Sequence, residues 1–302
     1  MPNILVIGSI NMDIVTTTPR IPKAGETMHC ESTRLYPGGK GANTAVAAAR
    51  LGADVAMIGS LGDDAFGRSL RATLDAEGVD TSAVAHSDVE TGTAVILVET
   101  GGQNRILVAR GSNAHVALPD DDRPFEWADA VLFQFETPLD VIDEAARRAH
   151  ALGKTVIVDA GPPQAELSDA LLRSADIVSP NETEIESLTG VAVTDWDDAE
   201  RAAAALREIG AKAVALKLGS LGSLWMDHDG VRRQEAFAVD AVDTTAAGDA
   251  WTAALAVSLT RGLTIEEALR HASAVGALTC TKAGAQPSLP AGEEVEGFLR
   301  DR

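Results

Sequence analysis

The sequence contains few cysteines, few aromatic residues and no long hydrophobic run. Among its 302 residues are 2 cysteines, Cys30 and Cys280, and only 4% of the residues are aromatic. The cysteines form no C-x-x-C pair, which is typical of two reduced thiols in a cytoplasmic protein. No apolar stretch approaches the roughly 20 residues that a membrane-spanning helix needs. The first residues also lack the charged segment and the cleavage site of a signal peptide. We therefore expect a cytoplasmic protein without a membrane partner.

Positive charge is also scarce. Acidic residues outnumber basic residues 45 to 25, and the formal net charge is −20. This balance argues against nucleic acid or an anionic membrane as a partner, because both require clustered positive charge. An anionic substrate would have to be held by local amide groups and a few cationic side chains. The six histidines show no ligand spacing, so we expect no metal site built from histidine.

Two common nucleotide-binding motifs are missing. No G-x-G-x-x-G follows the first predicted strand, and G-x-x-x-x-G-K-[ST] occurs nowhere in the chain. A Rossmann dehydrogenase and a P-loop enzyme are therefore both unsupported. Any nucleotide site must be built in another way.

Alternating strands and helices are what the sequence does contain. From residue 130 to residue 218, short apolar strands alternate with amphipathic helices, and the connections between them are short. Repeated units of this length predict a parallel sheet with helices on both faces, here in one domain covering residues 1–302. Two β-rich segments, 14–36 and 91–110, interrupt this pattern and predict a small second sheet. In the second segment, residues 100–104 are predicted to form the turn of a hairpin.

The run Asp-Thr-Thr-Ala-Ala-Gly-Asp at residues 243–249 lies where an extended segment, 239–245, changes into a long apolar helix. The first turn of a helix offers amide groups without partners, and its partial positive charge attracts anions. The small residues Ala246, Ala247 and Gly248 would leave those amides open. Asp249 would stand beside them as a base, an arrangement suited to phosphoryl transfer. The alternative is that Asp249 only compensates the helix dipole and the small residues only allow close packing.

Two polar motifs near the start of the chain suit a sugar. Gly-Ser-Ile-Asn-Met-Asp at residues 8–13 follows the first strand, at the end where ligands bind in open α/β sheets. Gly-Gly-Lys-Gly-Ala-Asn at residues 38–43 opens a helix. The candidate sugar-binding residues are Asn11, Asp13, Gly38, Gly39, Lys40 and Asn43. The alternatives are ordinary turn residues in the first motif and tight helix packing in the second.

Two further acidic positions follow predicted strands. Glu136 follows the strand at residues 130–135, where it can contact a substrate or cap a helix. Asn181 and Glu184 have the spacing of a capping box, which by itself explains both residues. The same two side chains can also face a nucleotide.

Together these motifs resemble the ribokinase-like carbohydrate kinases of the phosphofructokinase-B type, in collinear order from residue 8 to residue 288. The resemblance implies a three-layer αβα sandwich with a central, mainly parallel sheet. It also implies a small β-sheet lid, from about residues 12–36 and 91–110, that covers the sugar and pairs two subunits. We therefore expect a homodimer.

The resemblance further implies ATP-dependent phosphorylation of the primary hydroxyl of D-ribose, giving D-ribose 5-phosphate, with Mg²⁺ and K⁺. It makes Asp249 the base, with the amides of Ala246, Ala247 and Gly248 around the transferred group. On the sugar side it adds Glu136. On the nucleotide side it implies Asn181, Lys217, Gly219, Gly222, Thr245, Gly248 and Ser273. The metal-site residues it implies are Glu184 for Mg²⁺ and Asp243, Thr245, Thr279, Lys282, Gly284 and Ser288 for K⁺.

Some residues depart from the family pattern. Relatives usually carry Thr where Lys217 stands and a basic residue where Leu221 stands, and Asp159 lies in a segment that usually reads Asn-Pro-Ala-Pro. These departures leave the sugar open. The alternatives are deoxyribose, fructose, a 2-keto-3-deoxy sugar acid or a nucleoside, or a non-catalytic module that binds sugar or nucleotide.

Overall fold

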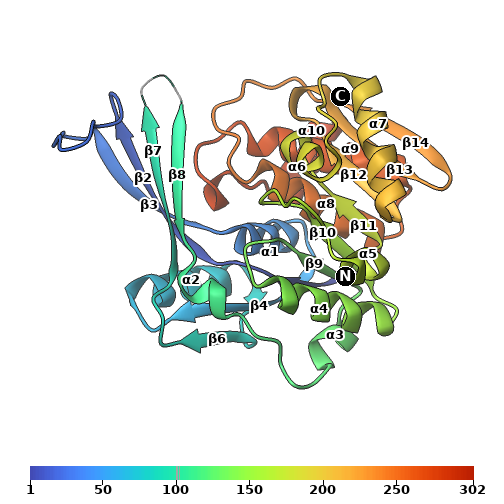
Figure 1. Ribbon diagram of the computed structural model, residues 1–302, viewed down its shortest axis with the longest axis horizontal. Coiled ribbons are helices and arrows are strands. Elements are labelled where there is room, and N and C mark those ends of the chain that lie inside the picture. Colours follow the sequence, from blue (N-terminus) through green and yellow to red (C-terminus); the bar gives the residue numbers. More distant parts are fainter. Residues whose placement is uncertain (100, 102) are drawn as a thin grey trace.

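The computed structural model describes residues 1–99, 101 and 103–302, which form two β-sheets with helices around the larger one (Figure 1). The larger sheet contains β1 (Asn3–Ile7), β4 (Asp54–Gly62), β5 (Val79–Asp80), β6 (Val84–Ser87), β9 (Ala130–Phe133), β10 (Thr155–Asp159), β11 (Ile177–Ser179), β12 (Ala213–Lys217), β13 (Gly222–Asp227) and β14 (Gly230–Glu235). The smaller sheet contains β2 (Asn11–Thr18), β3 (Ser32–Gly38), β7 (Gly92–Glu99) and β8 (Asn104–Ala109).

The helices alternate with the strands of the larger sheet. They are α1 (Lys40–Arg50), α2 (Ala65–Ala76), α3 (Arg123–Trp127), α4 (Leu139–Ala151), α5 (Asp169–Ser174), α6 (Glu182–Thr189), α7 (Trp196–Ile209), α8 (Ala247–Thr260), α9 (Ile265–Thr279) and α10 (Gly292–Arg300). Three short 3-10 turns complete the chain: η1 (Gly111–His115), η2 (Gly219–Leu221) and η3 (Gln286–Ser288).

The larger sheet has the strand order β14-β13-β12-β11-β10-β9-β1-β4-β5, and β6 also pairs with β4. All neighbours from β12 to β5 are parallel, whereas β13 and β14 form an antiparallel edge. The carboxyl ends of the parallel strands therefore meet at one edge of the sheet, where ligands bind in folds of this kind. The predicted mainly parallel sheet is confirmed.

Side chains of the central strands alternate between two cores. In β1, Ile4 and Val6 pack in one hydrophobic cluster, and Leu5 and Ile7 pack in the other. This follows from the two-residue period of a strand. The first cluster includes side chains of α1, α2, α8, α9 and α10, and the second includes those of α3 to α7. The sheet is thus covered on both faces, as predicted for a three-layer αβα sandwich.

The smaller sheet projects from the body as a separate ribbon (Figure 1), and we call it the lid. Its strand order is β3-β2-β7-β8, with β2 parallel to β7 and the other pairs antiparallel. The predicted hairpin at 91–110 corresponds to β7 and β8, but its turn includes residues 100 and 102, which lie outside the described residues. Asp13 lies in β2, inside the predicted lid segment, and Asn11 is the first residue of β2, one residue before the predicted boundary at about residue 12, so the lid carries both.

Four parts of the chain differ from the sequence prediction. The hairpin of β13 and β14 and the short strands β5 and β6 were not expected. Residues 27–31 form no strand, so β3 begins later than predicted. Residues 239–245 were predicted to be extended, and they contain no strand. Instead, the amides of Val242 and Asp243 bond to the carbonyl of Cys280 after α9, which fastens this segment to the end of a helix.

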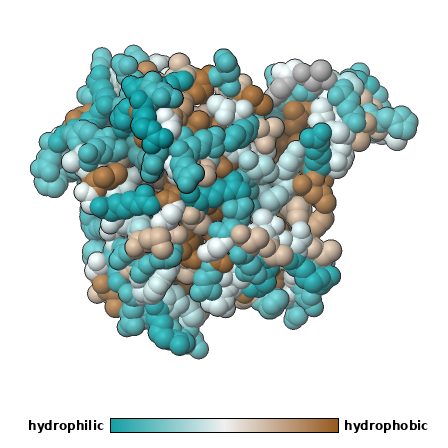
Figure 2. All heavy atoms as spheres, turned by 180° about the vertical axis from the view of Figure 1, so that it is seen from behind, coloured by the Kyte–Doolittle hydropathy of each residue, from teal (hydrophilic) through white to brown (hydrophobic). Residues whose placement is uncertain are grey.

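From behind, hydrophilic side chains dominate the surface and small hydrophobic patches interrupt them (Figure 2). Within residues 1–99, 101 and 103–302, no helix combines the length and the apolar character needed to cross a membrane. Cys30 is exposed, Cys280 is partly buried, and both thiols are free.

Candidate active site

Asp249 lies in the first turn of α8, a deeply packed helix. Every residue of α8 from Asp249 to Ser258 is buried, and Asp249 is 4% exposed. Its Oδ2 accepts a hydrogen bond from Asn43 Nδ2 at 2.9 Å, and Lys40 Nζ lies 3.3 Å from its Oδ1. The two motifs predicted to meet here, 38–43 and 243–249, are thus in direct contact.

The turn before α8 has an unusual backbone. Ala246, the N-cap residue, has φ 63°, the only positive φ of a non-glycine residue in the described chain, and no side chain caps the helix. A left-handed alanine costs about 1–2 kcal/mol, and such strain is concentrated at functional sites. The amides of Ala246 and Gly248 have no acceptor among the described residues. The amide of Ala247 differs from the prediction, because this tight turn directs it to the carbonyl of Thr244 at 3.2 Å.

The sugar side of the site is assembled from the lid, α1 and the end of β9. Glu136 accepts hydrogen bonds from the amide of Lys40, at 3.2 Å, and from the hydroxyl of Ser9. Asn43 Oδ1 is buried and has no hydrogen-bond partner among the described residues. A buried polar atom without a partner is costly. It therefore fits a site that is completed by a hydroxyl-bearing ligand.

Asp13 lies close against the backbone of the second motif. A Cβ at Gly38 would lie 2.2 Å from Asp13 Oδ2, so this carboxylate reaches its place only because residue 38 is glycine. At the next residue, Gly39 has φ 90°, a conformation that side chains rarely adopt. Burial, together with the nearby charges of Glu136 and Asp249, raises the pKa of Asp13 to about 7.

Lys40 differs from the role that the sequence predicted. Its ammonium group lies on Asp249, and a Cβ at Gly161 would lie 2.9 Å from Nζ and 2.5 Å from Glu184 Oε1. Burial alone would lower the pKa of Lys40, but the surrounding carboxylates outweigh burial and raise it. Those carboxylates belong to Asp249, Asp159, Glu184 and Glu136. The ammonium group of Lys40 thus lies between Asp249 and the segment around Gly161 and Glu184.

A cavity of about 470 Å³ adjoins the first turn of α8 and fits a nucleotide. Five of the residues predicted for the nucleotide side line it: Lys217, Gly219, Gly222, Gly248 and Ser273. Much of the remaining lining is small or apolar, including Phe237, Val239, Gly276 and Ala277. Pockets of this kind suit a planar base with the phosphates toward the polar end.

Asn181 and Thr245 do not line this cavity. Asn181 is the N-cap of α6 and forms the capping box: its Oδ1 accepts from the amide of Glu184 at 2.9 Å, and Glu184 Oε2 accepts from the amide of Asn181 at 2.8 Å. Glu184 is nevertheless 3% exposed, and burial raises its pKa although Lys217 opposes this effect. The capping interpretation and a role near phosphate are therefore compatible.

Asp243 connects the two segments predicted to hold a monovalent cation. Its carboxylate accepts from the amide and the hydroxyl of Thr245, at 3.0 and 2.7 Å, and from the amide of Gly284 at 2.9 Å. The hydroxyls of Thr279 and Ser288 are buried and bond to carbonyls of their own segments. The side chain of Lys282 points elsewhere, to Glu294, so only its carbonyl remains for a cation.

Three residues near the site had no role in the sequence prediction. Asn113, in η1, donates to Asn11 Oδ1 at 2.7 Å and to the carbonyl of Ile10, and so fixes the orientation of the Asn11 amide. Ser9 bonds to Glu136. Asp159 pairs with Lys217 at 2.6 Å. Only Asp159 had a sequence signal, because it departs from the family pattern, and a lone asparagine or serine in a loop gives none.

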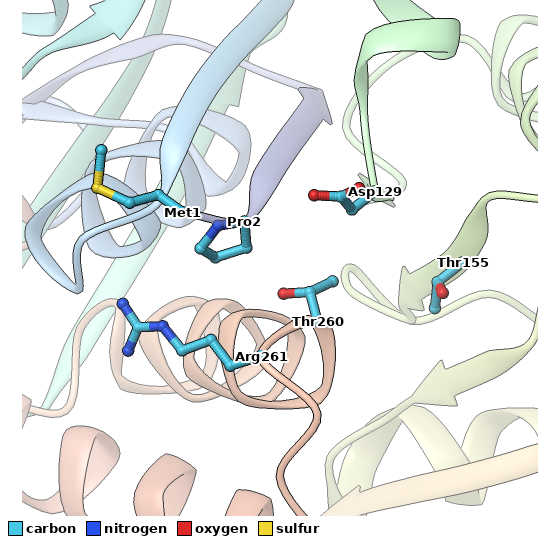
Figure 3. A pocket seen from close by; sticks show the side chains of 6 residues that line it. All are labelled: Met1, Pro2, Asp129, Thr155, Thr260 and Arg261. Carbon is cyan, nitrogen blue, oxygen red and sulfur yellow. The ribbon is translucent and has the colours of Figure 1, made fainter.

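A second hollow, of about 550 Å³, lies at the opposite edge of the sheet, near the amino ends of β1 and β10 (Figure 3). Its two charged residues already connect elements of the fold. Asp129 accepts from the amide of Asn3 at 2.8 Å, and Arg261 donates to the carbonyl of Leu51 at 2.6 Å. We therefore place the active site at the carboxyl edge, where the predicted residues meet.

The chain has relatives of known activity along its full length. Residues 1–292 match the family described as pfkB family carbohydrate kinase. A ribokinase of Haemophilus influenzae is 39% identical over 298 residues, covering 97% of both chains. A deoxyribokinase of Salmonella typhi is 34% identical over 301 residues, covering 98% of both. The solved structure of Arabidopsis thaliana ribokinase complexed with ribose and ATP matches with a TM-score of 0.92 and 36% identity, covering 99% of this chain and 98% of that one. This chain therefore belongs to the pfkB family of carbohydrate kinases.

Proposed function

We propose that this protein is a ribokinase, which transfers the γ-phosphoryl group of ATP to the primary hydroxyl of D-ribose and yields D-ribose 5-phosphate. The observation that carries the proposal is the position of Asp249. Its buried carboxylate lies between the sugar-side residues and the nucleotide cavity, beside open amides of a helix start. The relatives that bind or phosphorylate ribose support the choice of sugar.

In this proposal Asp249 accepts the proton of the attacking hydroxyl, and Asn43 and Lys40 hold the carboxylate in place. The amides of Ala246 and Gly248 stabilise charge on the transferred group, an electrostatic contribution that is typically worth several kcal/mol. Asn11, Asp13 and Glu136 orient the sugar hydroxyls. Lys217 and Lys40 offset the charge of the phosphates, which the acidic protein as a whole would repel.

Two ions complete the proposal. The buried carboxylate of Glu184 fits Mg²⁺ and its waters, because Mg²⁺ prefers oxygen ligands and keeps several waters. When bound, Mg²⁺ offsets phosphate charge. The carboxylate of Asp243 and the carbonyls of residues 245, 279, 282 and 284 form an oxygen-rich set that fits a larger, weakly hydrated ion, which we propose to be K⁺. Asp243 ties this set to the turn that carries Ala246.

We also propose that the protein forms a homodimer through the lid. The strand registers place Leu35, Ile14, Val95 and Leu107 in one row across all four lid strands. Directly paired residues share a face, so this apolar row lies on the face opposite to Asn11 and Asp13. Leu35 is 53% exposed and Leu107 is 70% exposed. A second copy would cover the row.

A sugar panel tests the proposed activity. ADP release should be measured with ATP and, in turn, D-ribose, deoxyribose, fructose, a 2-keto-3-deoxy sugar acid and adenosine. We expect the highest kcat/KM with D-ribose. A higher value with deoxyribose would assign the chain to the activity of its deoxyribokinase relatives instead, and no ADP release with any acceptor would indicate a binding module.

A further inference from the structure

A buried ion pair joins the carboxyl ends of β10 and β12, next to the nucleotide cavity. Lys217 Nζ lies 2.6 Å from Asp159 Oδ2, and the two residues are 9% and 1% exposed. Thr252 of α8 donates its hydroxyl to the same Asp159 oxygen at 2.7 Å and lies 3.3 Å from Lys217 Nζ. The three residues thus connect two strands of the sheet with the helix that carries Asp249.

The ammonium group of Lys217 faces the first turn of α8. A Cβ built at Gly248 would lie 3.9 Å from Lys217 Nζ, and both residues line the nucleotide cavity. An ammonium group has three donors. Asp159 and Thr252 occupy two of them, and the described residues provide no acceptor for the third. The third donor is therefore free for a ligand in the cavity.

Charge supports the same arrangement. Burial alone would raise the pKa of Asp159, but the ammonium groups of Lys217 and Lys40 outweigh burial and hold it below its usual value. A buried ion pair adds little stability by itself, because the desolvation of both groups offsets their attraction. What the pair does provide is a fixed direction for a flexible lysine side chain.

We propose that Asp159 is a positioning residue for phosphoryl transfer, holding the ammonium group of Lys217 against the terminal phosphates of the nucleotide beside the amide of Gly248. This inference rests on the proposed kinase function. Asp159 does not touch the substrates and acts only through Lys217.

The test is a double-mutant cycle in the full chain, with Asp159→Asn, Lys217→Met and the combination of the two. For each variant, ATP affinity is measured by calorimetry without sugar, and kcat and the KM values for ATP and ribose are measured with both substrates. Calorimetry does not require turnover, so a failure of the inference is distinguishable from a failure of the proposed function. Glu77→Gln is the matched control, because it breaks the Arg50–Glu77 pair far from the cavity.

We expect Asp159→Asn to weaken ATP binding and to lower kcat/KM for ATP by about 10- to 100-fold. This is less than the roughly 10²–10³-fold loss typical of removing a group that contacts the transferred charge, because Lys217 itself remains. The KM for ribose should stay within about twofold. Lys217→Met should cause at least as large a loss, and the double variant should equal Lys217→Met. Glu77→Gln should lower only the melting temperature, because Glu77 does not line the cavity.

Two results would overturn the inference. One is wild-type ATP binding and turnover in Asp159→Asn. The other is an additive loss in the double variant, which would show that Asp159 acts independently of Lys217 by anchoring α8. If Asp159→Asn does not fold, the double variant, which leaves no charge of this pair unpaired, is compared with Lys217→Met alone. Equal ATP kinetics support the inference, and a further loss contradicts it.

Discussion

Several neighbouring residues fix the position of the Asp249 carboxylate. Asn43 and Lys40 hold its two oxygens, and Gly248 precedes it with an open amide. The open amides beside Asp249 were predictable from the sequence, because helix starts have free amides. The contacts of Asn43 and Lys40 with Asp249 were not predicted, because both residues were assigned to the sugar. The support provided by Asn113 and Ser9 was not predicted either, since each depends on a contact between segments that are distant in sequence.

We expect Asp249→Asn to lower kcat by roughly 10²–10⁴, the usual range for loss of a general base. Affinity for ribose and ATP should be retained, because the amide has the size of the carboxylate and can still contact Asn43. Steady-state kinetics and calorimetry measure the two effects separately. A kcat close to that of the wild type would exclude Asp249 as the base.

Asp13 provides a test that depends on pH. Its pKa is raised to about 7 in the folded protein, so the folded state binds a proton more tightly than the unfolded state. The stability associated with protonated Asp13 is therefore fully present below pH 4 and is lost as pH rises through 7. Asp13→Asn should raise the melting temperature at pH 8 and leave it nearly unchanged at pH 4. The gain in the free energy of unfolding at pH 8 should be at most roughly 4 kcal/mol. Equal changes at both pH values would contradict the assignment.

At the scale of elements, the helix starts were easier to predict than the strands. α1, α6 and α8 begin within a few residues of their predicted positions, because glycine, a capping box and a change in periodicity mark them. The β13–β14 hairpin was missed, since β14 carries Arg232, Arg233 and Gln234 and shows no apolar alternation. Residues 239–245 show the opposite error: their β-branched side chains predict an extended strand-like segment, but the structure contains no strand there. Hydrogen bonds to the end of α9 hold the segment instead.

The turn before α8 predicts an effect of monovalent cations. A cation bound at Asp243 would hold the segment that leads to Ala246 and so fix the open amides. Activity should be higher in KCl than in NaCl at equal ionic strength. Asp243→Ala should remove the difference and also lower the rate in both salts, because Thr245 and Gly284 lose their acceptor.

Asp243→Asn is the matched control for this experiment. Its amide oxygen can still accept from Thr245, but the charge is gone. We expect it to lose the preference for potassium while it keeps more activity than Asp243→Ala. Equal rates of the unaltered protein in potassium, sodium and a bulky organic cation would exclude the cation site.

At the scale of the whole molecule, the lid is the sheet that projects from the body (Figure 1). Its apolar row, defined by Leu35, Ile14, Val95 and Leu107, contains two exposed leucines, Leu35 and Leu107, and we expect a second copy to cover the row. The lid was predictable as a separate sheet from its alternating pattern. Asp13 lies inside the predicted lid segment, whereas the inclusion of Asn11 depended on the residue at which β2 begins, which the sequence did not reveal.

We expect Leu107→Glu to convert a dimer into a monomer, because the new charge would be buried in the proposed contact. Light scattering coupled to gel filtration measures the mass directly. Leu139→Glu, at a leucine that is 50% exposed in α4, is the control and should leave the mass unchanged. An unaltered protein that elutes as a monomer at all concentrations would exclude the dimer.

The burial of α8 also has a consequence for turnover. Because Asp249 belongs to a helix packed on all sides, the base cannot shift without opening the core of the protein. We therefore expect entry of sugar and escape of product to depend on movement of the lid, which carries two of the proposed sugar-binding residues, Asn11 and Asp13. We therefore expect the transfer step to depend on the core around α8 and product release to depend on the lid. Viscosity and lid substitutions will act on release, whereas the geometry of the transfer step remains that of the core.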